Sequence, residues 1–355
     1  ITVFSTVVNG GNLALPNGAD TLIVCLDDDL PDITDVTLSN TIGDSSQWIV
    51  TDTSFNILAI PSAPPFDFGA IAEGTCLLWH LSYSGELSGV QIEANVSAFS
   101  GCFDLSNPIT IIRNRGINCE TSFTAQLTGM SQSPCPVTTT GVGAVEITLD
   151  GNTIRVTGTF SRLSADYDVD LGAHLHLAAA GQTGPILFAL TPSLTTDLRS
   201  GQFAVANNTF ELNEDQLTAL RYRKFYVNIP TLDHPAGEIR GQCLPSSATP
   251  YRAVLSGVEE VPSVVTMAHG ELWFELSGNE LTVSGSFSRL QGDLATEILG
   301  GAHIHQAVAG RTGPVVFPLK LSINEDFRSA EVLADSNVFL LSAEQVAALK
   351  KYELY

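Results

Sequence analysis

Two pairs of histidines are the residues of this sequence best suited to chemistry. His174 and His176 stand two positions apart, as do His303 and His305. In a β-strand, residues two apart project from the same face, so each pair could direct two imidazoles at one metal ion. Neutral imidazole nitrogens are good ligands for copper and zinc. The spacing therefore indicates two candidate copper or zinc sites.

Further ligands are scarce around both pairs. His234 is the candidate third ligand for the first pair, whereas the second pair has only His269, far upstream. Two histidines hold a metal ion poorly, because zinc and copper sites usually need three or four protein ligands. The alternative is structural: the histidines hydrogen-bond the backbone of the glycine-rich loop that follows, or of the GEIRGQ strand (237–242), and lock a corner of the domain. The residues alone leave both interpretations open.

A second candidate site is the acidic segment LDDDLPD (26–32). Its carboxylates could offer oxygen ligands to Ca²⁺. The segment lacks the glycine and the terminal glutamate of an EF-hand loop, so a solvated acidic turn is the alternative. The candidate calcium ligands are Asp27, Asp28, Asp29 and Asp32.

The sequence predicts no enzyme. It contains no GxSxG elbow, no P-loop, no GxGxxG after a strand and no HExxH. Glu238 and Arg240, two apart in the GEIRGQ strand, come nearest to an acid and its partner. We expect them to form a cross-strand ion pair or a cap.

Charge narrows the choice of partners. The chain of 355 residues carries 38 acidic and 16 basic side chains, a net charge of −22. Residues 1–112 contain thirteen Asp or Glu and no Lys or Arg. Such a surface repels nucleic acid and anionic membranes. No apolar run reaches the roughly 18 residues of a transmembrane helix. The first residues, ITVFSTVV, lack the features of a signal peptide, and we expect a mature or trimmed form.

Six cysteines favour disulfides and an oxidising, extracellular or cell-surface location, since they show no CxxC and no zinc-finger spacing. Cys119 and Cys243 bracket one segment of the chain, and we predict that they pair. Six cysteines allow fifteen pairings, so the other combinations stay open. The candidates are Cys25, Cys76, Cys102, Cys119, Cys135 and Cys243.

The elements that must position these residues are predicted to be strands. Alternating or buried apolar runs lie between Pro and Gly in residues 1–117, which predicts an acidic β-sandwich. Residues 47–52 and 55–61 read as a hairpin. The other predicted strands are 21–25, 75–85, 90–99 and 107–114.

Residues 120–245 and 250–355 form an internal repeat. His174 matches His303 and Tyr226 matches Tyr355, both at a distance of 129 residues. Each copy contains one helical signal, at 212–225 and 341–354, with Asn213 or Ser342 as the N-cap. The fold class is therefore all-β, with three β-sandwich domains in tandem and one short helix in each repeat. The second copy stops at the equivalent of Tyr226, and we expect it to lack its closing strands.

The repeats resemble the CHRD (chordin) domain. The motifs on which this resemblance rests are LSGVEEVP, GSFSRL, AHIHxxxxGxTGPVVFPL, LSAEQVAAL and, in the first copy, YVNIPTLDHPAGEIRGQ. The resemblance implies an all-β domain of extracellular proteins. One departure is Pro230, where the family usually has histidine. Residues 20–115 resemble a module repeated in large secreted surface proteins of bacteria, through VTDTSFNILAIP and GCFDLSNPITIIRN. That resemblance implies secretion and no chemistry.

Together these observations predict a non-enzymatic extracellular structural protein, a subunit of a surface filament, layer or adhesin that self-associates. The alternative is a copper/zinc-binding domain, since the AHxH strand and its Gly-rich loop are similar to the copper strand of Cu/Zn superoxide dismutases. The β-prone first segment is a candidate assembly strand, which would complete the second repeat of the next subunit. It consists of Ile1, Thr2, Val3, Phe4, Ser5, Thr6, Val7 and Val8. The alternative is that the polypeptide is a fragment and its closing strands belong beyond Tyr355.

Overall fold

The computed structural model describes residues 7–16, 18–25, 33–68, 74–114 and 119–355. The chain divides into two compact units, Ile1–Cys119 and Glu120–Tyr355. Strands dominate both units, so the predicted all-β fold class is confirmed. The candidate calcium ligands Asp27, Asp28, Asp29 and Asp32, and the candidate assembly residues 1–6, lie outside the described residues.

The first unit is organised around the long strand β8, which pairs with three other strands. The main sheet has the order β2-β10-β8-β5-β6, with β9 also on β8, and β1–β4 and β3–β7 form two further pairs. The predicted hairpin is present as β5 and β6. The strands are β1 (Asn12–Ala14), β2 (Thr21–Cys25), β3 (Ile33–Thr34), β4 (Thr37–Ser39), β5 (Ser45–Asp52), β6 (Ile57–Ala59), β7 (Phe66–Asp67), β8 (Gly74–Ser88), β9 (Ser100–Leu105) and β10 (Ile109–Asn114).

The strand predicted at 90–99 is wrong. The segment contains a turn and a short 3-10 helix, Val96–Ala98. Asn95 accepts a hydrogen bond from the Ser97 backbone N–H at 3.0 Å and donates to the Ser54 carbonyl at 2.8 Å. A short polar side chain that bonds its own backbone competes with a strand ladder, and that local bond outweighs the apolar alternation.

The predicted Cys119–Cys243 disulfide is also wrong. Cys119 pairs with Cys25 at the end of β2, with Cα atoms 5.5 Å apart. Cys243 instead lies in the core of the first repeat with no exposed surface, and burial raises the pKa of its thiol. A disulfide nevertheless closes the first unit, as the cysteine content of the chain favours.

The first repeat is one continuous, strongly curved sheet with the order β15-β14-β19-β20-β11-β12-β13-β17-β16. Alternate residues of β11, β12 and β13 point inward and form a core with Leu220 of the helix. Its elements are β11 (Ser122–Thr128), β12 (Val142–Asp150), β13 (Thr153–Ser161), β14 (Ala173–Leu177), β15 (Ile186–Leu190), β16 (Pro192–Leu194), β17 (Gly201–Phe203), β18 (Thr209–Glu211), α1 (Glu214–Arg221), β19 (Phe225–Thr231), β20 (His234–Gln242) and β21 (Leu244–Pro245).

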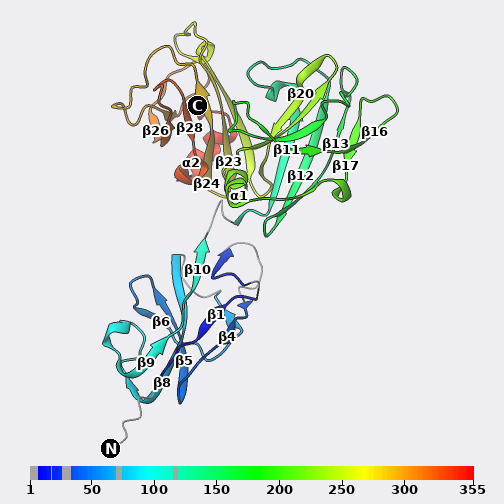
Figure 1. The fold of residues 1–355 in the computed structure, drawn as a ribbon. Coiled ribbons are helices and arrows are strands. Elements are labelled where there is room, and N and C mark those ends of the chain that lie inside the picture. The colour runs from blue at the N-terminus through cyan, green and yellow to red at the C-terminus, as the bar shows by residue number, and fades with distance from the viewer. Residues whose placement is uncertain (1–6, 17, 26–32, 69–73, 115–118) are drawn as a thin grey trace, which may run out of the picture. The chain divides into compact units, whose positions relative to one another are not determined.

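The second repeat has the same strands up to α2, and it packs beside the first within one unit (Figure 1). Its main sheet has the order β22-β23-β24-β28-β27, and β25 and β26 form a separate pair. No strand of the described chain takes the places that β19 and β20 have in the first repeat. Its elements are β22 (Thr249–Ser256), β23 (His269–Ser277), β24 (Glu280–Ser288), β25 (His303–His305), β26 (Val315–Pro318), β27 (Leu321–Ile323), β28 (Ala330–Val332), β29 (Val338–Leu340) and α2 (Ala343–Lys350).

Both predicted helices and both N-caps are confirmed. Asn213 and Ser342 each accept a hydrogen bond from the backbone of the glutamine three residues later, and that glutamine bonds back to the cap. Each helix therefore begins where its sequence indicates. No helix in the described residues is long and apolar enough to cross a membrane.

The candidate metal site and its surroundings

His176 holds the glycine loop of the first repeat in place. The carbonyl of Gly184 lies 3.0 Å from His176 Nδ1, and because a carbonyl only accepts, this nitrogen carries the proton. The imidazole stacks on Tyr226, with centroids 4.8 Å apart and planes 10° apart. The Tyr226 hydroxyl in turn accepts from the Gly184 N–H at 3.1 Å. Both backbone polar groups of Gly184 are therefore satisfied by one stacked His–Tyr pair.

The second repeat builds the same clamp. His305 Nδ1 lies 2.9 Å from the Gly313 carbonyl, and the Tyr355 hydroxyl accepts from the Gly313 N–H at 2.8 Å. The rings stack at 5.4 Å and 20°. This is the structural role that the sequence offers as the alternative to metal binding.

Glycine is required inside the clamp. A Cβ atom on Gly184 would lie 1.7 Å from the carbonyl oxygen of Leu177. The same atom on Gly313 would lie 1.9 Å from the carbonyl oxygen of Gln306. No side chain fits in either gap, so the loop can approach its own strand closely only with glycine at these positions.

The other nitrogen of His176 is the feature that keeps metal binding open. Its Nε2 is buried without a hydrogen-bond partner. The His174 ring lies beside it, with centroids 5.6 Å apart. Burial lowers the pKa of both imidazoles, which favours the neutral, ligand-competent form. In the second repeat Nε2 of His303 has a partner, since it lies 2.8 Å from the Ile298 carbonyl.

The structure does not bring a third ligand to these pairs. Across the described residues, no group of three or more His, Cys, Asp or Glu side chains is placed to hold a metal ion. His234 begins β20 and pairs with Thr231. His269 bonds the Met267 carbonyl and lies near Ser288. A copper or zinc site therefore remains a prediction that rests on two histidines per repeat.

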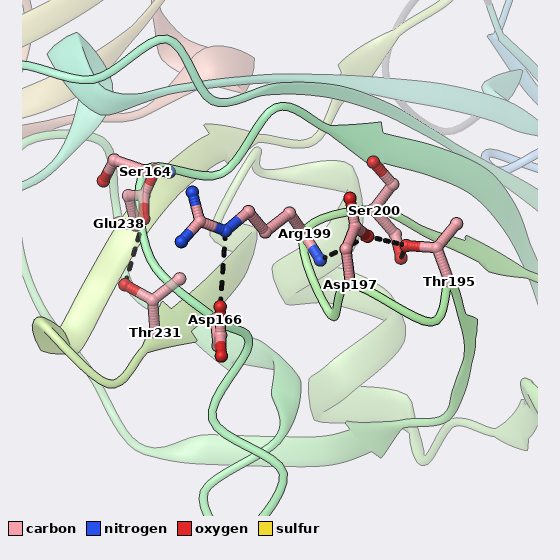
Figure 2. A network of polar contacts seen from close by, with 8 residues as sticks. All are labelled: Ser164, Asp166, Thr195, Asp197, Arg199, Ser200, Thr231 and Glu238. Carbon is pink, nitrogen blue, oxygen red and sulfur yellow. Dashed lines mark hydrogen bonds and ion pairs between the residues drawn. The ribbon is translucent and has the colours of Figure 1, made fainter.

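Glu238 is a buried cap rather than half of an ion pair. Its side chain is fully buried and accepts hydrogen bonds from the Thr231 hydroxyl and the Ser164 N–H (Figure 2). It also accepts one from the Thr139 hydroxyl. Burial alone would raise the pKa of Glu238, but these hydrogen bonds outweigh it and the pKa is lowered. Arg240 stacks over Tyr226 instead, with Cζ 3.6 Å from the ring centroid. Of the two roles expected for these residues, a cross-strand ion pair or a cap, the structure shows the cap at Glu238.

The charged residues Asp197, Arg199 and Asp166, also drawn in Figure 2, hold loops together. Asp197 accepts from the Thr195 hydroxyl at 2.6 Å and from the Arg199 N–H at 3.2 Å. The Arg199 side chain reaches Asp166 at 3.3 Å. The second repeat repeats the arrangement, with Arg328 3.0 Å from Asp293. These carboxylates hold loop geometry in both copies.

Sequence reasoning missed the contact between the repeats. Arg223 follows α1 and donates three hydrogen bonds to the carboxylate of Glu275 on β23, two from Nε and one from Nη2, at 2.9–3.1 Å. Their side chains are 3% and 2% exposed. Lys224 pairs with Glu331 at 2.6 Å. The sequence does hold one sign of this contact. The second repeat has the carboxylates Glu275 and Glu331 where the first repeat has the neutral residues Thr148 and Gln202.

Comparisons with known proteins agree with the repeat. A family model described as the CHRD domain matches residues 123–243 and 251–355. The match does not extend to the first unit, whose resemblance to bacterial surface modules stays a prediction. A search of curated proteins finds no match.

Proposed function

The chain belongs to the CHRD domain family, and we propose that it is a structural building block of an extracellular assembly: a surface filament, layer or adhesin. CHRD domains are extracellular modules without enzymatic activity. The Cys25–Cys119 disulfide fits an oxidising compartment.

One observation carries the structural proposal. The polar side chains that could have done chemistry bind the backbone: His176 and His305 each use Nδ1 to hold a glycine loop, and Glu238 accepts from the Ser164 N–H. A catalytic group must keep a free atom facing substrate. These side chains instead make the shape of the repeat rigid, as a building block requires.

The assembly mode we propose is strand donation. In the first repeat, β19 and β20 lie between β14 and β11 in the sheet. In the second repeat, β25 corresponds to β14 and β22 corresponds to β11. Along β22, the described chain leaves one edge without a strand partner, and an unpaired edge is a template for another strand. Residues 1–8 supply a β-prone donor. Within that segment Val7 is 65% exposed.

Analytical ultracentrifugation of the whole chain, with and without residues 1–8, tests this proposal. We expect assemblies well above the 37.7 kDa monomer for the whole chain and their loss on truncation. Negative-stain electron microscopy of the same samples separates filaments from aggregates. Equal assembly by the truncated chain would remove residues 1–8 as the donor, and a monomer in both samples would remove self-assembly.

Copper or zinc binding is the second candidate function, favoured by the unpartnered Nε2 of His176 beside His174. Elemental analysis of the purified chain tests it after incubation with one metal and removal of the excess. Stoichiometric copper or zinc that disappears in a His174→Ala, His176→Ala variant and persists in His269→Ala would establish the site. Equal metal content in all three chains would leave these histidines with the clamp alone.

A further inference from the structure

Apart from a bond of the Arg252 side chain to the Met130 carbonyl, the polar contacts between the two repeats in the described chain join one face on each. The first repeat contributes its glycine loop and the corner after α1, and we name this the docking face: Ala180, Gly181, Tyr222, Arg223 and Lys224. The second repeat contributes the outer surface of β23, β24 and β28 with the turn that follows, and we name this the receiving face: Glu275, Ser286, Glu331 and Asp335.

Hydrogen bonds join these two faces at four points. Besides the two ion pairs at Arg223 and Lys224, the Tyr222 hydroxyl donates to Asp335 at 2.8 Å. The Ser286 hydroxyl donates to the Ala180 carbonyl at 2.6 Å. Ala180 is 2% exposed and Ser286 1%. The contact is therefore buried at Ala180 and Ser286, and its polar groups are paired.

The second repeat carries the same docking face, and there it is exposed. The glycine loop has the same conformation, with φ of 82° at Gly181 and 75° at Gly310. The corner is also conserved, with φ of 61° at Arg223 and 58° at Tyr352. Tyr352 is nevertheless 76% exposed, where Arg223 is 3% exposed. The exposed docking face comprises Ala309, Gly310, Lys351, Tyr352 and the half-buried Glu353.

The first repeat carries the same receiving face, and it is exposed as well. In the second repeat Ser286 pairs with Glu331 across β24 and β28, and in the first Thr159 pairs with Gln202 across β13 and β17. The equivalence therefore follows from strand register as well as from sequence. The exposed receiving face comprises Thr148, Thr159, Gln202 and Ala206.

We propose that the docking face of the second repeat binds the receiving face of the first repeat in another copy of this chain. The proposal rests on the self-assembly proposed above and names a surface for it. The interface inside the chain supplies the template, because the two folds already meet in this way once. Such a contact is heterologous, because it joins two different faces. A pair of bound copies still has one open docking face and one open receiving face, so further copies can add until a filament or a closed ring forms.

The side chains on the two exposed faces suit one another. Thr159 stands in the place of Ser286, so its hydroxyl can donate to the Ala309 carbonyl as Ser286 donates to Ala180. Gln202 stands opposite Glu353 and offers amide N–H donors to the carboxylate. Val308, 56% exposed, adds apolar surface where the first repeat has the buried Ala179.

The charged pairs also set which faces meet. Arg223 placed against a first repeat would face Thr148 instead of Glu275 and would be buried without a carboxylate, which is strongly unfavourable. The Arg223–Glu275 pair therefore directs the first docking face to the second repeat of its own chain. The docking face of the second repeat and the receiving face of the first repeat remain for contact between copies.

Two arginine variants of the whole chain test the surface. Ala309→Arg blocks the docking face and Thr159→Arg blocks the receiving face, while Thr296→Arg adds the same charge at an exposed loop position outside both. A cooperative melting transition followed by circular dichroism would verify that each variant is folded. By sedimentation velocity, we expect the wild type and Thr296→Arg to grow in mass with concentration. The two face variants should each stay at the monomer mass.

Mixing provides the sharpest readout. In an equimolar mixture of the two face variants, one intact docking face meets one intact receiving face, so we expect assembly to stop at twice the monomer mass. A mixture that stays monomeric, or face variants that assemble like the wild type, overturns the proposed surface. Assembly that survives both arginine variants but is lost on removal of residues 1–8 overturns this surface and leaves strand donation standing. A wild-type chain that stays monomeric overturns both.

Discussion

His176 lies flat against Tyr226, with ring centroids 4.8 Å apart, and the two side chains bind the two backbone polar groups of Gly184. Arg240 covers the other face of the tyrosine, 3.6 Å from its centroid. The histidine that the sequence marks as a metal ligand is thus one layer of a His–Tyr–Arg stack. In the second repeat His305 and Tyr355 repeat the first two layers.

The first prediction concerns the hydroxyl of that stack. Tyr226→Phe removes the acceptor for the Gly184 N–H and keeps the stacking ring. We expect the free energy of unfolding to fall by about 1 kcal/mol, the usual worth of such a hydrogen bond. Urea unfolding measures it. Tyr355→Phe is the matched variant and should cost less, because its bond to Gly313 is exposed. No change in Tyr226→Phe would show that the hydroxyl bond contributes nothing.

The second prediction concerns the buried ion pair between the repeats. Glu275→Ala leaves the Arg223 guanidinium buried without its carboxylate, and we expect a loss of about 3–5 kcal/mol in unfolding free energy. Replacing both residues, as Arg223→Met with Glu275→Leu, should cost less than the single change. Asp150→Ala, which breaks an exposed pair with Arg155 at 3.3 Å, should cost about 0.5 kcal/mol or less. A double variant that loses more unfolding free energy than Glu275→Ala would contradict this prediction.

The third prediction concerns pH. Burial lowers the pKa of His174 and His176 from the ordinary 6.5, so the unfolded chain binds more protons than the folded one near that pH. The stability that this difference contributes is complete above pH 6.5 and is lost as the pH falls through that value toward the folded pKa. Urea unfolding at pH 7.5 and 5.5 should show the loss. His176→Asn should weaken the dependence of the unfolding free energy on pH. An unchanged pH dependence in that variant would contradict the assignment of the effect to His176.

The fourth prediction concerns the disulfide. Cys25 and Cys119 are 94 residues apart in sequence, and in the chain-entropy model such a loop contributes about 4–5 kcal/mol by restricting the unfolded state. Reductant, or Cys25→Ser, should therefore lower the melting temperature of the first unit and leave that of the repeats unchanged. Calorimetry of the whole chain resolves the two units. A shift in the repeats alone would point to a different cysteine pairing.

Local patterns were sufficient for much of the fold. The strand at 21–25 and the hairpin of β5 and β6 follow from short apolar runs between turn residues. Both helices begin at the N-caps that the sequence indicates, because a capping box is formed within four residues. The strand expected at 90–99 failed for a local reason as well, since Asn95 bonds its own turn.

The sequence by itself determined the all-β class, the repeat and the helix starts, because these follow from apolar alternation, internal similarity and capping residues a few positions apart. It left open whether the histidines hold the glycine loops or bind metal. Only the tertiary structure decided which partner each side chain takes. Cys119 bonds Cys25 and Glu275 meets Arg223 because folding brings distant segments together, and composition cannot rank fifteen cysteine pairings or reveal how two repeats pack. The same packing leaves one copy of each contact face buried and the other exposed, although both copies have nearly the same sequence pattern.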